Sequence, residues 1–125
     1  MGLINTKISL RNPRYPDLTA VEAEALADTG TMQLCVPEHV AVQLRLERYD
    51  IKEVRIADGS WRSVPYMGPV EVRFKNRVSF GGALVFGDQV LLGAIAMEDM
   101  DLVVVPKDRS IDVNPASPAI ARSRA

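Results

Sequence analysis

The chain has 125 residues, of which 47% are hydrophobic and 25% charged, and its net charge at pH 7 is −1. This length suits one domain with a single modest core, and the low charge, with Lys and Arg spread along the chain, argues against a nucleic-acid or anionic-membrane partner. No apolar run reaches the roughly 20 residues of a membrane span, no signal-peptide pattern is present, and the single Cys35 excludes an internal disulfide. We therefore expect a cytoplasmic protein.

Alternation of apolar and polar residues in the first third of the chain predicts strands, because every second side chain of a strand faces the same side of a sheet. Strands are expected at residues 4–10, 19–27 and 31–35. A loop is expected at residues 12–17, where Asn, Pro and Asp gather. Pro37 suits the first position of a short helix with Val40 and Leu44 on one face.

The rest of the chain is divided into short segments by Gly, Pro, Asn and Asp, which favour turns. Between two of these segments, Asp58-Gly59-Ser60 is a strong hairpin signal, and a second hairpin is expected around residues 107–108. Strands are expected at residues 53–57, 61–65, 70–74, 83–86, 90–92, 102–105 and 110–113.

A second short helix is expected over residues 94–100. Its buried side would consist of Ile95, Met97 and Met100. The fold class is therefore mainly β, with one or two short helices. The folded domain is expected to span residues 1–113, and residues 114–125, which have little apolar surface to bury, are expected to form a disordered tail.

The tripeptide Asp28-Thr29-Gly30 ends the second predicted strand. A short polar segment with a glycine at such a place forms a tight turn that presents its first side chain. Asp28 is then either an ordinary turn residue or, if a second copy faces it, half of a pair of carboxylates.

Three features in chain order resemble the retropepsin-like aspartic proteases of clan AA, and among them the small bacterial and archaeal single-domain members. The strand into residues 28–30 is similar to the catalytic loop of that family. The hairpin at residues 58–60 is similar to the flap that closes over substrate, and Leu-Leu-Gly at residues 91–93, before a short helix, is similar to the family's motif of two hydrophobic residues and a glycine. The resemblance covers residues 4–113 and implies the acid-protease fold, a retropepsin-like closed β-barrel with one lobe per chain.

An aspartic protease needs one carboxylate as a base and one carboxylic acid as a proton donor at the same moment. Two carboxyl groups held close together share a proton, because both cannot ionise cheaply. The chain supplies a single Asp-Thr-Gly, so the resemblance implies a two-fold homodimer in which the catalytic Asp28 of each chain faces its copy. This chemistry uses a water molecule and needs no metal and no cofactor.

The resemblance also implies roles for the neighbours of Asp28. The Thr29 hydroxyl would bond across the dimer to the partner loop, and Gly30 would let the backbone approach the two carboxylates. Thr31 would donate a hydrogen bond to the outer oxygen of Asp28 and favour its ionised form.

Further site residues follow from the flap and from the second motif. The flap and substrate-binding residues would be Asp58, Gly59, Ser60 and Trp61. Trp61 is a candidate wall of the substrate pocket, or else a residue that packs in the core or at an edge. The motif that supports the catalytic loop from beneath would be Leu91, Leu92 and Gly93.

The function implied is that of an aspartic endopeptidase acting on peptides or unfolded protein segments. The alternative is a non-catalytic dimeric module that binds a peptide or protein on the same fold. The single His39 has no second His or Cys near it in the pattern of a metal site, so no metal is expected.

Overall fold

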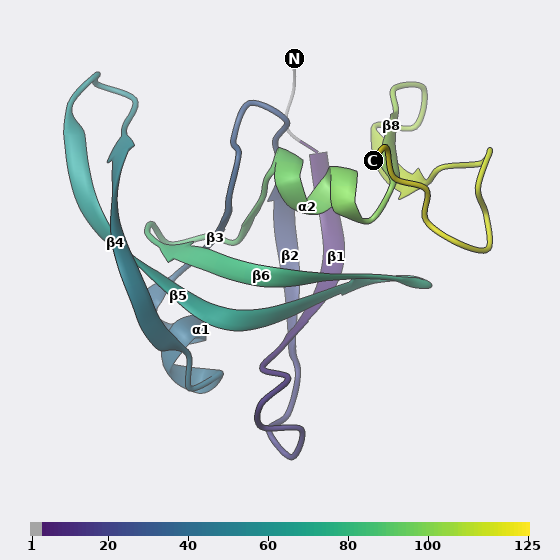
Figure 1. The fold of residues 1–125 in the computed structure, drawn as a ribbon. Helices are drawn as coiled ribbons and strands as arrows, with labels where there is room; N and C mark the ends of the chain where they lie inside the picture. The colour runs from purple at the N-terminus through teal and green to yellow at the C-terminus, as the bar shows by residue number, and fades with distance from the viewer. Residues whose placement is uncertain (1–3) are drawn as a thin grey trace.

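The computed structural model describes residues 4–125 and shows a mainly β protein with two short helices (Figure 1), as predicted. Its strands are β1 (Ile4–Arg11), β2 (Val21–Ala27), β3 (Leu34–Val36), β4 (Glu47–Arg55), β5 (Trp61–Phe74), β6 (Arg77–Val85), β7 (Leu91–Leu92), β8 (Leu102–Val105) and β9 (Ser110–Val113). Its helices are α1 (Glu38–Gln43) and α2 (Ala94–Asp99). Residues 1–3 of the predicted domain lie outside the described residues.

Six strands form a closed mixed barrel in the order β1-β2-β7-β3-β6-β5, and pairing of β1 with β5 closes it. The short strand β7 lies between β2, to which it is parallel, and β3, to which it is antiparallel. Strands β8 and β9 form a separate two-stranded sheet. Because β2, β7 and β3 are neighbours, the two sequence motifs that were expected to cooperate lie side by side.

Several element boundaries differ from the predictions. Strand β3 begins at Leu34 rather than at Thr31, because the chain is still turning after Asp28. Strand β5 unites two predicted strands, and β6 begins at Arg77, well before the predicted residues 83–86. The glycine pair at residues 81–82 lies inside β6, where the Tyr66 ring leaves no room for a Cβ at residue 82.

Apolar side chains from all six barrel strands fill the interior, and both helices contribute to this core. Val40 and Leu44 are buried, as expected for α1. In α2, Met97 and Met100 are buried, but Ile95 is 48% exposed, so the prediction for Ile95 was wrong. Residues two apart on a helix point in nearly opposite directions, so Ile95 cannot share the face of Met97.

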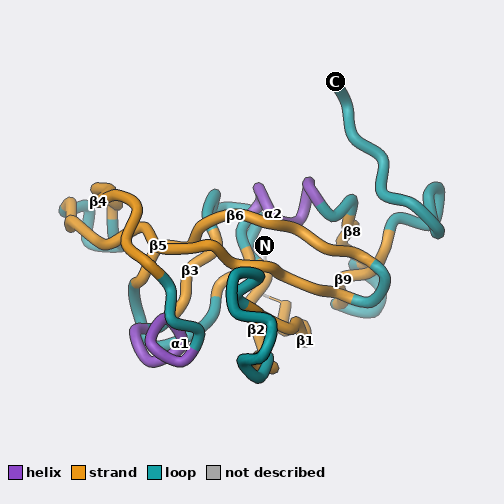
Figure 2. Tube along the Cα trace, turned by 60° about the horizontal axis from the view of Figure 1, so that its bottom comes forward, coloured by secondary structure: helices purple, strands orange, loops and turns teal. Residues whose placement is uncertain are grey.

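The β4–β5 hairpin extends away from the barrel (Figures 1 and 2). Among the described residues, strand β4 pairs only with β5. The turn at the tip of the hairpin is closed by a hydrogen bond from the Ile56 amide to the Ser60 carbonyl oxygen, 3.0 Å. Gly59 adopts φ +88°, which L side chains rarely tolerate. This confirms the hairpin predicted from residues 58–60.

Residues 114–125 contain no helix or strand, and the disorder expected of them stays a prediction. In the structure, Asp101 holds this segment through its carboxylate. The Asn114 side-chain amide, the Ser117 hydroxyl and the Arg122 backbone amide all donate to it. These bonds, the Ser117 bond first, lower the pKa of Asp101 to about 2.

We expect the Asp101 carboxylate to anchor the C-terminal segment in a pH-dependent way. The folded pKa lies below the ordinary value of 3.8, so the stabilisation is present above that value and is lost as the pH falls through about 2. Amide hydrogen exchange, corrected for intrinsic rates, should show protection of residues 114–122 falling between these two pH values. Asp101→Asn should remove the protection at neutral pH, whereas Asp108→Asn, in the exposed β8–β9 turn, should not. Equal protection in the wild type and Asp101→Asn would contradict the anchor.

Candidate active site

Asp28 lies directly after the last residue of β2, and β7 fixes its position. Ala27 pairs with Leu92 in the parallel β2–β7 register, and the Asp28 amide donates to the Leu92 carbonyl oxygen at 3.0 Å. Since β7 is held on its other side by β3, the backbone that presents Asp28 belongs to the closed barrel wall.

The Asp28 carboxylate is held within its own turn. The Gly30 amide donates to Oδ1 at 2.9 Å, and the Thr31 hydroxyl donates to Oδ2 at 3.1 Å. The Thr31 amide also donates to the Asp28 carbonyl oxygen, 3.1 Å, which closes the turn. Among residues 4–125, no Lys or Arg forms an ion pair with Asp28. Asp28 is half-buried, its carboxylate is oriented by these bonds, and no basic side chain of residues 4–125 is paired with it.

A small recess lies beside Asp28. It has a volume of about 30 Å³, and Asp28 and Thr29 line it together with apolar side chains. These side chains come from β1, β2, α2, β8 and β9: Ile4, Ala27, Met97, Val104 and Ile111. The recess has room for a water molecule but not for a peptide.

Gly93 allows the loop at residues 28–33, which we call the Asp28 loop, to approach the start of α2. A Cβ at residue 93 would lie 2.5 Å from the carbonyl oxygen of Gln33 and 2.6 Å from that of Met32. The close approach lets the Ala94 amide donate to the Thr31 carbonyl oxygen at 2.7 Å, and the Ile95 amide to that of Met32 at 3.1 Å. Amides in the first turn of a helix have no partner within the helix, so the loop satisfies them and is held in return.

The two leucines of the second motif point to different sides of the barrel wall. Leu92 is fully buried in the barrel core beneath the Asp28 loop, the place expected for both leucines. Leu91 is half-buried on the other side, where it belongs to a second apolar cluster that also includes residues of the β4–β5 hairpin. Side chains alternate along a strand, so two adjacent leucines cannot both lie beneath the loop.

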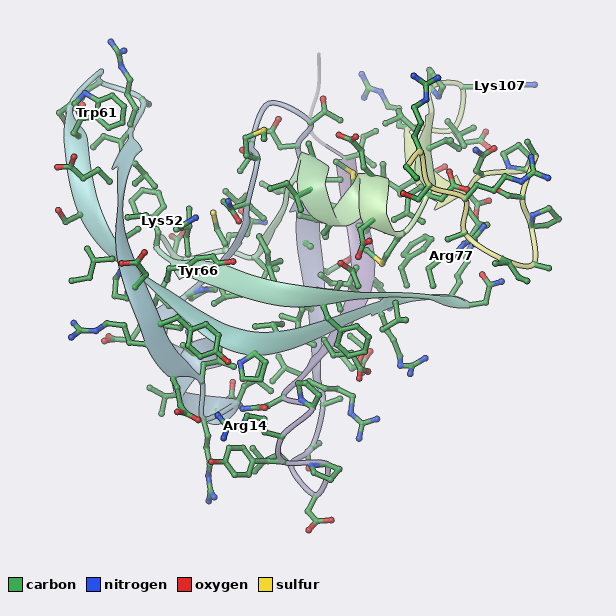
Figure 3. The ribbon with its side chains drawn as sticks, viewed as in Figure 1. Arg14, Lys52, Trp61, Tyr66, Arg77 and Lys107 are labelled. Carbon is green, nitrogen blue, oxygen red and sulfur yellow. The ribbon has the colours of Figure 1, made fainter. Side chains whose placement is uncertain are left out.

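The predicted flap residues lie at the tip of the β4–β5 hairpin. Asp58 Oδ1 accepts hydrogen bonds from the Ser60 amide at 2.8 Å and from its hydroxyl at 2.6 Å, which fixes the turn. Trp61 is 62% exposed near the tip (Figure 3), so it is not a core residue, and Arg55 lies over its ring at 5.8 Å. Within the described chain, no hydrogen bond or ion pair joins the flap tip to residues 28–30.

A second apolar cluster, which we call the flap-side cluster, was not predicted. It joins one face of the hairpin to the strands next to Asp28, and its members are Cys35, Val54, Val64, Tyr66, Leu84, Phe86 and Leu91. The hairpin register brings Val54 and Val64 onto one face. That register follows from the turn at residues 58–60, so extending the predicted pairing could have identified the hairpin half of the cluster.

Other candidate chemistries find little support in residues 4–125. Within the part of the chain that the structure describes, no group of three or more His, Cys, Asp or Glu is placed to hold a metal ion. His39 is exposed on α1, and burial raises the pKa of the Cys35 thiol, which disfavours the reactive thiolate. Neither α1 nor α2 is long or apolar enough to cross a membrane.

Comparison with known proteins adds no assignment: no family model matches the chain, and no curated protein matches it.

Proposed function

We propose that the protein is an aspartic endopeptidase with the retropepsin-like fold, active as a homodimer in which Asp28 of each chain contributes to one site. The observation that carries this proposal is the state of the Asp28 carboxylate. It stands at the end of a barrel strand, oriented by Gly30 and Thr31, with no basic side chain paired to it among the described residues. The bond from Gly30 is that of an ordinary Asp turn; what distinguishes Asp28 is that it also lines a recess of water size among apolar side chains.

Two features support a second copy of the chain as the source of the other carboxylate. The sequence contains one Asp-Thr-Gly. Thr29 and Gly30 are exposed next to Asp28, so the loop is open to a partner. A two-fold axis beside this loop would place the two Asp28 side chains opposite each other and would give both chains the same contacts.

In this dimer the two carboxyl groups share one proton. The ionised Asp28 takes a proton from water, whose oxygen attacks the peptide carbonyl carbon, while the protonated Asp28 donates to the carbonyl oxygen. Transfer of a proton to the nitrogen then allows the C–N bond to break. The products are a carboxylic acid and an amine, with the oxygen supplied by water. Gly30 and Thr31 keep the carboxylates in position during these transfers.

The substrate would be an extended segment lying between the flap and the floor formed by β3 and β7. Extended peptides bind such surfaces through main-chain hydrogen bonds, and alternate side chains enter pockets on one side. This requires a substrate without stable structure of its own, such as a peptide or an unfolded protein segment.

A transition-state mimic tests the proposal directly. A short peptide with a hydroxymethylene group in place of the scissile carbonyl should bind with a stoichiometry of one per two chains, measured by titration calorimetry and sedimentation. The same peptide without the hydroxyl should bind more weakly, because it cannot bridge the two carboxyls. Binding of one mimic to each monomer, or no binding across acid and neutral pH, would contradict the proposal.

A further inference from the structure

Two basic side chains lie on the face of the β4–β5 hairpin that contributes to the flap-side cluster. In the register of the hairpin, Lys52 is opposite Val64 and Val54 is opposite Arg62. Residues directly opposite each other in an antiparallel pair share a face, as do residues two apart along one strand. Lys52 and Arg62 therefore stand diagonally across the apolar pair formed by the two valines.

Both cations are placed by aromatic rings. The Lys52 Nζ lies 4.4 Å from the centre of the Tyr66 ring, and the Arg62 Cζ lies 5.6 Å from that of the Phe86 ring. The Tyr66 ring is itself packed against Gly82 of β6. Figure 3 shows Lys52 and Tyr66 close together on the side of the hairpin that faces the barrel. The rings hold the two charges at the edges of the apolar cluster.

Neither cation forms an ion pair among residues 4–125, where the ion pairs involve other residues. Two carboxylates of the same hairpin form hydrogen bonds with neutral groups of their own segments: Asp50 accepts from the Ile51 amide, and Asp58 accepts from Ser60. Hydrogen bonds from Ser60, together with the more modest effect of the Arg62 charge, keep the pKa of Asp58 below its usual range.

Resting on the function proposed above, we propose that the site selects acidic peptide segments. The half-buried members of the flap-side cluster, such as Val54 and Leu91, contact an apolar side chain of the extended substrate. Lys52 or Arg62 then binds a carboxylate two positions away from that side chain. The spacing follows from the substrate itself, since side chains two apart in an extended peptide point to the same side. When the flap closes and excludes water, the attraction between these charges increases.

Peptide binding to the Asp28→Asn protein tests this specificity without cleavage. Fluorescence anisotropy would compare a peptide that has a central Leu flanked two residues away by Glu with the same peptide containing Gln. The Glu peptide should bind roughly fivefold more tightly at low salt, and the preference should shrink as salt is added. The double variant Lys52→Met, Arg62→Met should lose the preference while retaining its affinity for the Gln peptide.

The matched control is Arg55→Met, because Arg55 lies on the opposite face of the same hairpin and should leave the preference intact. Three results would overturn the inference. They are equal binding of the two peptides by the Asp28→Asn protein with Lys52 and Arg62 unchanged, a Glu preference that survives in the double variant, and failure of every peptide to bind. Wild-type protein assayed with the same peptides tests the proposed function separately. Binding with the Glu preference but without cleavage would refute the peptidase and support the acidic specificity. Cleavage without the Glu preference would support the peptidase and refute the acidic specificity.

Discussion

In the proposed peptidase, replacement of Asp28 by Asn should abolish peptide cleavage and leave the fold and the proposed homodimer intact. Asn has the shape of Asp and retains an oxygen that can accept from the Gly30 amide, so the turn should persist. It can neither accept a proton from water nor share one with a second carboxyl group. We expect the rate to fall by a factor on the order of 10³ or more, measured as kcat on a quenched fluorescent peptide. Circular dichroism and sedimentation should match those of the wild type.

Mixing the two proteins distinguishes a shared site from one site in each chain. If Asp28 of both chains is required, heterodimers are inactive, and an equal mixture after subunit exchange retains about a quarter of the activity of the same total amount of wild type. Independent sites would retain about half. The second result would refute a shared pair of carboxylates. Unchanged cleavage by pure Asp28→Asn would refute any catalytic role for this residue.

Gly93→Ala should be the most damaging small substitution at the site. Its Cβ would meet the backbone carbonyl oxygens of Met32 and Gln33 at 2.6 and 2.5 Å, and backbone atoms cannot rotate away as a side chain can. The approach of α2 to the Asp28 loop would be lost or strained. We expect a loss of about 3 kcal/mol in the free energy of unfolding, measured by urea denaturation, together with loss of binding of the transition-state mimic.

Gly81→Ala provides the matched control. Gly81 lies in strand β6 of the same barrel, and nothing stands within 4 Å of the position that a Cβ would take. Its effect on the free energy of unfolding should be within about 0.5 kcal/mol. Equal stability of Gly93→Ala and Gly81→Ala would show that the contact between the loop and α2 is not needed to hold the barrel together.

Local chemistry allowed the turns to be predicted. Asp and Gly restrict the backbone to a few tight conformations, so the hairpin at residues 58–60 could be placed from the sequence, as could the turn that begins at Asp28. The hydrogen bond from Thr31 to Asp28, expected from the resemblance, is present in the structure. It connects side chains three residues apart, and so it depends little on the rest of the fold.

Long-range pairing could not be predicted in the same way. The two-residue strand β7 finds its place between β2 and β3, and no periodicity in so short a segment indicates its partners. The start of β6 also depends on a distant residue. The glycines at residues 81–82 favour a break in the sequence, and only the packing of Tyr66 against Gly82 shows why they lie within a strand. Ile95 was assigned to the wrong face of α2, because a six-residue helix contains too few turns to define its buried side.

The sequence by itself determined the mainly β class, the two short helices and the oriented Asp28 turn. Only the tertiary structure decided that Leu91 and Leu92 divide between two clusters, that Gly93 must lack a side chain, and that Lys52 and Arg62 flank an apolar strip. The physical reason is distance along the chain. A turn depends on the backbone preferences of adjacent residues, whereas a barrel wall depends on which distant strands exclude water together, and that choice is made by the whole chain at once.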